Sequence, residues 1–173
     1  AGHAFVRFID RRRRPARLAK LGLELVLGGG VLVLVFFDGE ECTREYGPED
    51  GLHGSRFFVE DLKSSGKTSW VRAMILLDMI GDARLNVTLP VNGDPKLIEQ
   101  AFEAARDAGH RDFFGFGKGE VLDDHVPFLR AGIPAVDLID FEYGSAPGVN
   151  DYWHTDKDTL DKISPRSLQI AGQ

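Results

Sequence analysis

The sequence is poor in cysteine, methionine and tryptophan, and it has no excess of basic charge. A single cysteine among 173 residues, Cys42, cannot form an internal disulfide, which excludes a disulfide scaffold and a cysteine-rich zinc site. A net charge of −6 argues against general nucleic-acid binding, so no nucleic-acid partner is expected. The length fits one domain with a real hydrophobic core.

The first 30 residues differ in composition from the rest. They carry seven basic and two acidic residues and lead into a long apolar run, a pattern that signal peptides and membrane spans share. Glu24 and three consecutive glycines at 28–30 interrupt that run, and no small-residue cleavage site follows it. We therefore predict no membrane span, regard residues 1–30 as an atypical basic segment, and place the domain at residues 31–173.

Strand and helix patterns alternate after residue 30. Residues 31–37 and 71–81 are short apolar runs typical of buried strands. The clearest helix spans residues 94–109, because Asp94 suits the N-cap, Pro95 the first turn and Gly109 the C-terminal stop. Such alternation predicts a mostly parallel sheet covered on both faces. Further elements are expected at 55–64, 123–132 and 164–172 (helices) and at 133–140 (strand).

Acidic residues follow the buried strands. Glu40 and Glu41 come just after the first strand, Asp78 ends the second, and the segment 137–140 ends the third. The carboxyl ends of strands in α/β sheets are where ligands bind, and so many carboxylates at one edge would repel each other unless a cation neutralised them. His154 adds an imidazole. Carboxylates with a histidine and no thiolate suit zinc or a similar divalent metal.

The adjacent glutamates have a chemical explanation. Beyond the strand end, after the flexible Gly39, both side chains can turn toward one point. One can bind the metal while the other moves a proton beside it, which places a Lewis acid next to a general base. A pair of acids at a strand end is more often a solvated loop, and it is the combination with Asp78, Asp123 and His154 that favours a site.

Five motifs follow one another along the chain: VFFDGEE, DGLHGSR, MILLDMIG, DDHVPFLRAGIP and YWHTDKDTLDKIS. In this order they resemble the zinc aminopeptidase family that includes the glutaminyl-peptide cyclotransferases. The resemblance implies a three-layer α/β/α fold with a mixed, mostly parallel central sheet, and an enzyme that acts on peptide N-termini with one or two zinc ions. It also suggests a secreted or periplasmic enzyme, although no signal peptide is evident.

The resemblance implies a role for each motif residue. Glu40 matches the general acid/base, and Asp123 an acid that hydrogen-bonds in the cyclase site. The metal ligands implied are Glu41 and His154, with Asp78 binding a second zinc in aminopeptidases or joining a hydrogen-bond network in cyclases.

One part of the family pattern is missing from the sequence. Family members carry an upstream zinc-binding Asp, usually in a segment like DNASG, and residues 1–30 contain no such segment. Asp10, which stands beside a run of arginines, is interpreted as their solvated partner. A catalytically incomplete fragment of the fold is therefore one hypothesis.

The motifs favour the cyclases over the aminopeptidases, and both readings stay open. Trp153 is expected in the substrate pocket, where core packing is an equal alternative for it. Tyr46 stands where animal cyclases have a pocket Trp. A cyclase would convert an N-terminal Gln to pyroglutamate and release ammonia, whereas an aminopeptidase would hydrolyse the first peptide bond.

Overall fold

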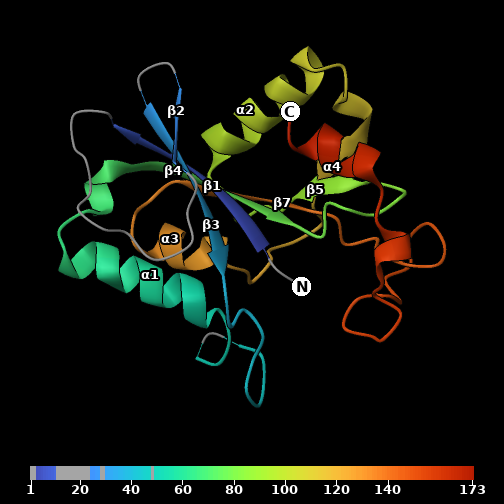
Figure 1. The fold of residues 1–173 in the computed structure, drawn as a ribbon, viewed down its shortest axis with the longest axis horizontal. Coiled ribbons are helices and arrows are strands. Elements are labelled where there is room, and N and C mark those ends of the chain that lie inside the picture. Colours follow the sequence, from blue (N-terminus) through green and yellow to red (C-terminus); the bar gives the residue numbers. More distant parts are fainter. Residues whose placement is uncertain (1–2, 11–23, 28–29, 48) are drawn as a thin grey trace.

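The computed structural model contains one sheet whose described strands lie in the order β2-β3-β1-β4-β7-β5-β6. The structure describes residues 3–10, 24–27, 30–47 and 49–173, and the side chains of 31–47 and 49–173. Figure 1 shows the sheet running through the middle of the molecule with helices on either side. The strands are β1 (His3–Asp10), β2 (Glu24–Leu27), β3 (Gly30–Phe37), β4 (Val71–Asp78), β5 (Val87–Leu89), β6 (Phe114–Phe116) and β7 (Ala135–Ile139).

The strand directions bring three strand ends to the same edge of the sheet. β3 and β4 each pair antiparallel with β1, so β3 and β4 run in the same direction. β7 pairs parallel with β4, with Asp78 opposite Ile139. The residues that follow β3, β4 and β7 therefore emerge at one edge.

Helices cover both faces of the sheet (Figure 1). On one face, α1 and α3 pack against β3 and β4 through a core that contains Phe58, Leu76 and Phe128. On the other face, α2 and α4 pack against β5, β6 and β7 through Phe102, Val136 and other apolar residues. The helices are α1 (His53–Ser64), α2 (Pro95–Asp107), α3 (His125–Arg130) and α4 (Pro165–Ala171), with short 3-10 helices at Thr68–Trp70, Arg111–Phe113 and Leu160–Lys162.

The helices expected from the sequence are present, and α2 and α4 each begin with a side-chain cap. The Asp94 side chain accepts hydrogen bonds from the backbone N–H groups of Lys96 and Leu97, at 3.0 and 3.1 Å. Ser164 caps α4 by accepting from the N–H of Ser167 at 3.4 Å. The three-layer α/β/α architecture with a mixed sheet is confirmed.

Three expectations about strands need correction. β1, β2, β5 and β6 were not predicted: β5 and β6 are three residues each, too short for a periodic pattern, and β1 and β2 fall in the segment set apart as atypical. Parallel pairs are fewer than expected, because β1 inserts antiparallel between β3 and β4. β3 is not fully buried, since the side chain of Phe36 is 57% exposed.

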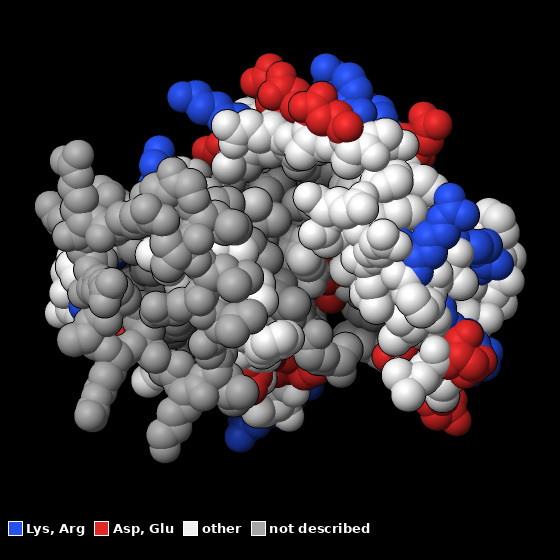
Figure 2. All heavy atoms as spheres, turned by 45° about the horizontal axis from the view of Figure 1, so that its top comes forward, with Lys and Arg blue, Asp and Glu red and all other residues white. Residues whose placement is uncertain are grey.

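Two observations concern the whole described part of the chain. None of its helices combines the length and the apolar character needed to cross a membrane. On the face drawn in Figure 2, basic and acidic side chains are interspersed over the part of the surface that is not grey.

The side chain of Asp10 lies outside the described residues, so its predicted solvated state stays a prediction.

Candidate active site

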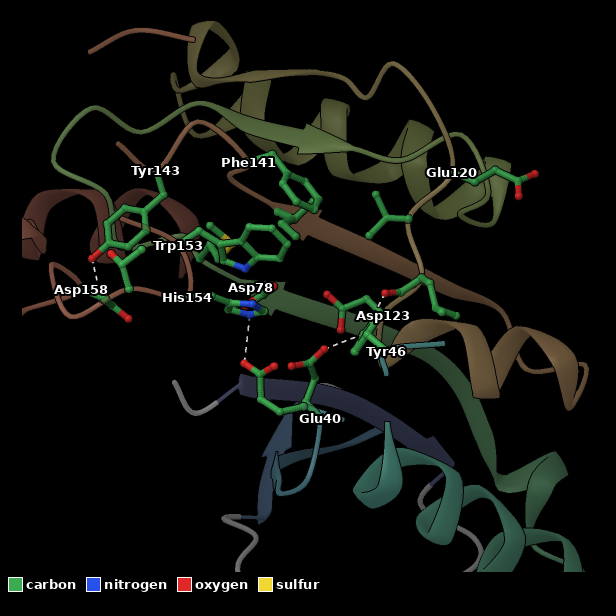
Figure 3. Close-up of a pocket in the computed structure, with 16 residues that line it drawn as sticks. Glu40, Tyr46, Asp78, Glu120, Asp123, Phe141, Tyr143, Trp153, His154 and Asp158 are labelled. Carbon is green, nitrogen blue, oxygen red and sulfur yellow. Dashed lines mark hydrogen bonds and ion pairs between the residues drawn. The ribbon is translucent and has the colours of Figure 1, made fainter. Parts of the chain in front are cut away.

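A pocket of about 570 Å³ lies at the edge where β3, β4 and β7 end. The loop after β3 contributes Glu40, Glu41 and Tyr46, and Asp78 comes from the end of β4 (Figure 3). Every site residue expected from the sequence lines this pocket. The set is Glu40, Glu41, Tyr46, Asp78, Asp123, Trp153 and His154.

The two adjacent glutamates have different partners. The hydroxyl of Tyr46 donates a hydrogen bond to Oε1 of Glu40 at 2.6 Å. Oε1 of Glu41 lies 3.0 Å from Nε2 of His154, and both side chains are about half exposed. Figure 3 shows both contacts as dashed lines on the same side of the pocket. The two side chains thus line one pocket but contact different residues.

The backbone around the glutamates is fixed by the start of α1. The N–H groups of Leu52 and His53 donate to the carbonyl oxygens of Glu40 and Gly39, both at 2.8 Å. Gly39 has φ +59°, a left-handed conformation that a side chain would strain. These contacts fix the direction in which the loop leaves β3, and therefore the backbone positions of Glu40 and Glu41.

Strained backbone gathers at the pocket. Among the described residues, three non-glycine positions have positive φ: Leu52 (54°), Met79 (55°) and His154 (56°). Met79 and His154 line the pocket, and the N–H of Leu52 holds the carbonyl of Glu40. Such conformations are costly and concentrate at functional sites.

Buried acids lie at the pocket and next to it. Asp123 is 4% exposed and Asp137 is fully buried. Burial, followed by the negative charges of Asp137 and Asp78, raises the pKa of Asp123 well above its usual range. Burial, followed by the charges of Asp78 and Asp124, does the same to the pKa of Asp137. These carboxyl groups therefore hold protons more tightly than solvated ones.

A buried histidine accompanies these acids. His125 at the start of α3 is fully buried, and its Nδ1 lies 3.9 Å from Oδ2 of Asp137. Burial lowers the pKa of His125 to about 4, so the ring is neutral at pH 7. The sequence pattern placed the segment 137–140 among the acids at the strand ends, but a lone Asp inside the strand AVDLI carries no signal that would show Asp137 to be fully buried beside His125.

Aromatic rings line the side of the pocket that faces Glu40 (Figure 3). The ring of Trp153 stacks on that of His154, with centroids 4.1 Å apart and planes at 28°. Phe141 meets Trp153 edge to face at 6.1 Å. Trp153 is 43% exposed, so it faces the pocket and is not core packing. Phe141 was missed, because the loop after β7 has no periodic pattern that would indicate which side chains face inward.

Glu41 and His154 are the side chains best placed to hold a metal. Atoms that are each about 2 Å from one zinc ion lie roughly 3 Å apart, and the 3.0 Å between Oε1 of Glu41 and Nε2 of His154 fits this. Within the described part of the chain, no group of three His, Cys, Asp or Glu side chains is close enough to hold an ion. Asp78 lines the pocket but does not complete such a group.

The fold and the pocket together define the class. The mixed sheet between helical layers is shared with a glutaminyl cyclase and a Zn-dependent exopeptidase of known structure. Residues 28–173 match the family described as peptidase family M28, and the chain belongs to this family.

Individual relatives agree with this assignment. A glutaminyl cyclase structure from an Acidobacteriales bacterium is 40% identical with a TM-score of 0.72, and the match covers 79% of this chain and 47% of that one. A Zn-dependent exopeptidase from Parabacteroides distasonis is 29% identical with a TM-score of 0.69, covering 84% and 52%. The glutaminyl-peptide cyclotransferase of Boiga irregularis is 33% identical over 80% of this chain and 44% of its own length. The chain thus spans about half the length of these relatives.

Proposed function

We propose that the protein is a zinc-dependent enzyme acting on peptide N-termini, with glutaminyl-peptide cyclotransferase as the favoured reaction. One observation carries the proposal: Glu40, held by Tyr46, stands beside the Glu41–His154 pair in a single pocket. A proton-transfer group next to a metal-binding pair is the arrangement that amide chemistry needs. Similarity to cyclases from several organisms supports this choice of reaction.

Glu41 and His154 would hold the zinc ion, and Asp78 is our first choice for a further ligand. Bound there, zinc supplies a Lewis acid that polarises an amide carbonyl. The donor set fits zinc, since it consists of carboxylate oxygens and an imidazole nitrogen.

Glu40 would move the proton. In the cyclase reaction, the peptide's α-amine nitrogen attacks the side-chain amide carbon of its N-terminal Gln, and a C–N bond forms. Glu40 accepts the proton that the amine loses and delivers it to the nitrogen of the side-chain amide. The bond between the amide carbon and this nitrogen then breaks, and ammonia leaves. Asp123, whose pKa is raised well above its usual range by burial and by neighbouring carboxylates, would take part as a hydrogen-bonding acid. Trp153 would form a wall of the substrate pocket.

An aminopeptidase is the second candidate. The similarity to a Zn-dependent exopeptidase favours it, and the same residues would serve. Glu40 would then take a proton from the attacking water and deliver it to the leaving peptide amine. The two reactions differ in the nucleophile, which is the α-amine or a water, and in the amide attacked, which is the Gln side chain or the first peptide bond.

Two substrates distinguish the candidates. Both assays contain zinc. Turnover of a Gln-initiated peptide is measured by ammonia release and loss of the free amine, and turnover of a Leu-initiated amide is measured by release of free leucine. Ammonia release without leucine release supports the cyclase, and the reverse result supports the aminopeptidase. If the protein turns over neither substrate, both proposals are wrong and the hypothesis of a catalytically incomplete fragment stands.

A further inference from the structure

The Tyr46 side chain is held from three directions. Its hydroxyl lies 2.6 Å from Oε1 of Glu40 and 3.0 Å from the carbonyl oxygen of Leu122. Its ring lies over Gly51, where an added Cβ would come within 3.0 Å of the ring carbon Cε2 and 3.2 Å of the Glu40 carbonyl oxygen. Gly51 also has φ +125°, which side chains rarely adopt. Because residue 51 is a glycine, there is space for the Tyr46 ring next to the backbone of Glu40.

From this geometry we propose that Tyr46 is the positioning residue of Glu40, in addition to lining the pocket. The inference rests on the proposed function, because it assigns Tyr46 a task in the proton transfer by Glu40. Without the hydroxyl, the half-exposed Glu40 side chain would be free to leave the geometry that proton transfer requires. Reacting groups that are misplaced by even about 1 Å lose much of their rate.

The second acceptor explains why a phenol suits this task. A tyrosine hydroxyl has one proton to donate and an oxygen that can accept. While Glu40 is a carboxylate, Tyr46 donates to it. While Glu40 carries the transferred proton, Glu40 donates to the Tyr46 oxygen and the phenol proton turns to the Leu122 carbonyl. The phenol thus keeps Glu40 hydrogen-bonded in both states without moving.

The surroundings keep the phenol proton in place. Burial, followed by the hydrogen bond to Glu40 and its charge, raises the pKa of Tyr46 above its usual range. The hydroxyl therefore remains a donor at neutral pH. It acts through Glu40 and does not itself carry a proton to or from the substrate.

A double-mutant cycle tests the proposal on the zinc-loaded protein with a Gln-initiated peptide. We expect Tyr46→Phe to lower kcat at least about tenfold, as loss of a hydrogen bond to a charged group does, with KM changed less than about twofold. After Glu40→Gln, the same change should alter kcat less than about twofold, since there is no longer a proton-transfer group to position. Thermal melting and zinc content should match the wild type.

A matched control uses the other phenol–carboxylate pair of the pocket. Tyr143 donates to Oδ1 of Asp158 at 2.5 Å, whereas Glu40 is hydrogen-bonded by Tyr46. The effects of Tyr143→Phe and Glu40→Gln should therefore multiply. Gly51→Ala gives a second route, because its Cβ displaces the Tyr46 ring while keeping the hydroxyl. It should lower kcat in the wild type and much less after Tyr46→Phe.

The outcomes separate this inference from the proposed function. Turnover by the wild type with an unchanged kcat for Tyr46→Phe overturns the inference alone. The inference is also overturned if the effects of Tyr46→Phe and Glu40→Gln on kcat multiply in the double variant. The same holds if the loss of activity in Tyr46→Phe is explained by a lower zinc content or a lower melting temperature. Absence of any turnover by the wild type overturns the proposed function, and the inference falls with it.

Discussion

Two groups of acidic side chains meet at this pocket, and they are held in opposite ways. Glu40 and Glu41 stand on an accessible loop, and each has a close polar partner in Tyr46 or His154. Asp123 and Asp137 have almost no solvent contact, and neither oxygen of Asp137 has a hydrogen-bond partner among the described residues. An accessible carboxylate can exchange protons and ions, whereas a buried one mainly shapes the local electrostatic field.

The difference separates chemistry from stability. Substitutions in the accessible pair should change turnover and metal binding with little effect on folding. Substitutions in the buried pair should change the free energy of unfolding, because each buried carboxylate is destabilised by burial and by its neighbours. The predictions below test this division, beginning with the largest expected effect.

Glu40→Gln should have the largest effect. It keeps the side-chain shape and removes the proton-transfer group, so turnover should fall at least about 100-fold, within the range for general acid–base catalysis. Steady-state kinetics measures this loss, and zinc content should stay unchanged. Glu45→Gln, on the same loop but exposed, is the control. Equal activity of the two variants would mean that Glu40 is not catalytic.

Substitutions of the proposed metal ligands Glu41 and His154 should have the second-largest effect. Glu41→Gln and His154→Ala each remove one proposed ligand, so zinc affinity should fall at least about tenfold, or about 1.4 kcal/mol. Titration after chelation measures the affinity. The control is His110→Ala, since His110 contacts Gln173 and not the pocket. Zinc uptake that neither ligand variant reduces would show that the ligands are wrongly assigned.

Asp137→Asn should stabilise the metal-free protein at neutral pH. The folded-state pKa of Asp137 is raised, so its contribution to stability is full below about pH 4 and is lost as pH rises through the folded pKa. The variant avoids this loss. Its melting temperature should exceed that of the wild type at pH 7, by about 2–4 °C for each kcal/mol gained, and the gap should close toward pH 4.

Asp107→Asn provides the comparison for this change, because Asp107 is exposed at the end of α2. It should shift the melting temperature little at any pH. An Asp137 variant that is less stable than the wild type at pH 7 would show that the buried carboxyl group is needed for packing, and the division between the two groups of acids would fail.

Asp140 should give the smallest effect, because it combines burial with hydrogen bonds. Its carboxylate accepts from the N–H groups of Asn86 and Glu142, yet burial raises its pKa to about 6. Its contribution to stability should therefore fall between about pH 4 and pH 6. Asp140→Asn should flatten the melting-temperature profile in that window. An unchanged slope would show that the two hydrogen bonds offset the burial.

The sequence by itself determined the four helices, the strands β3, β4 and β7, and part of the residues that line the pocket. The caps Asp94 and Ser164 act through short-range hydrogen bonds, so they could be read from neighbouring residues. Glu40, Asp78 and His154 could be found because acids and a histidine stood in order after apolar strands, within motifs of a known family. Their roles stay predictions, and so does the boundary at residue 31.

Only the tertiary structure decided which side chains meet. The antiparallel insertion of β1 between β3 and β4 depends on pairing between distant segments, which no local pattern encodes. The fully buried Asp137 lies against His125 because β7 and α3 pack together. Tyr46 bridges Glu40 and the carbonyl oxygen of Leu122, which lies 76 residues away in sequence. Contacts of this kind depend on how distant elements pack, whereas helix caps depend only on residues a few positions apart.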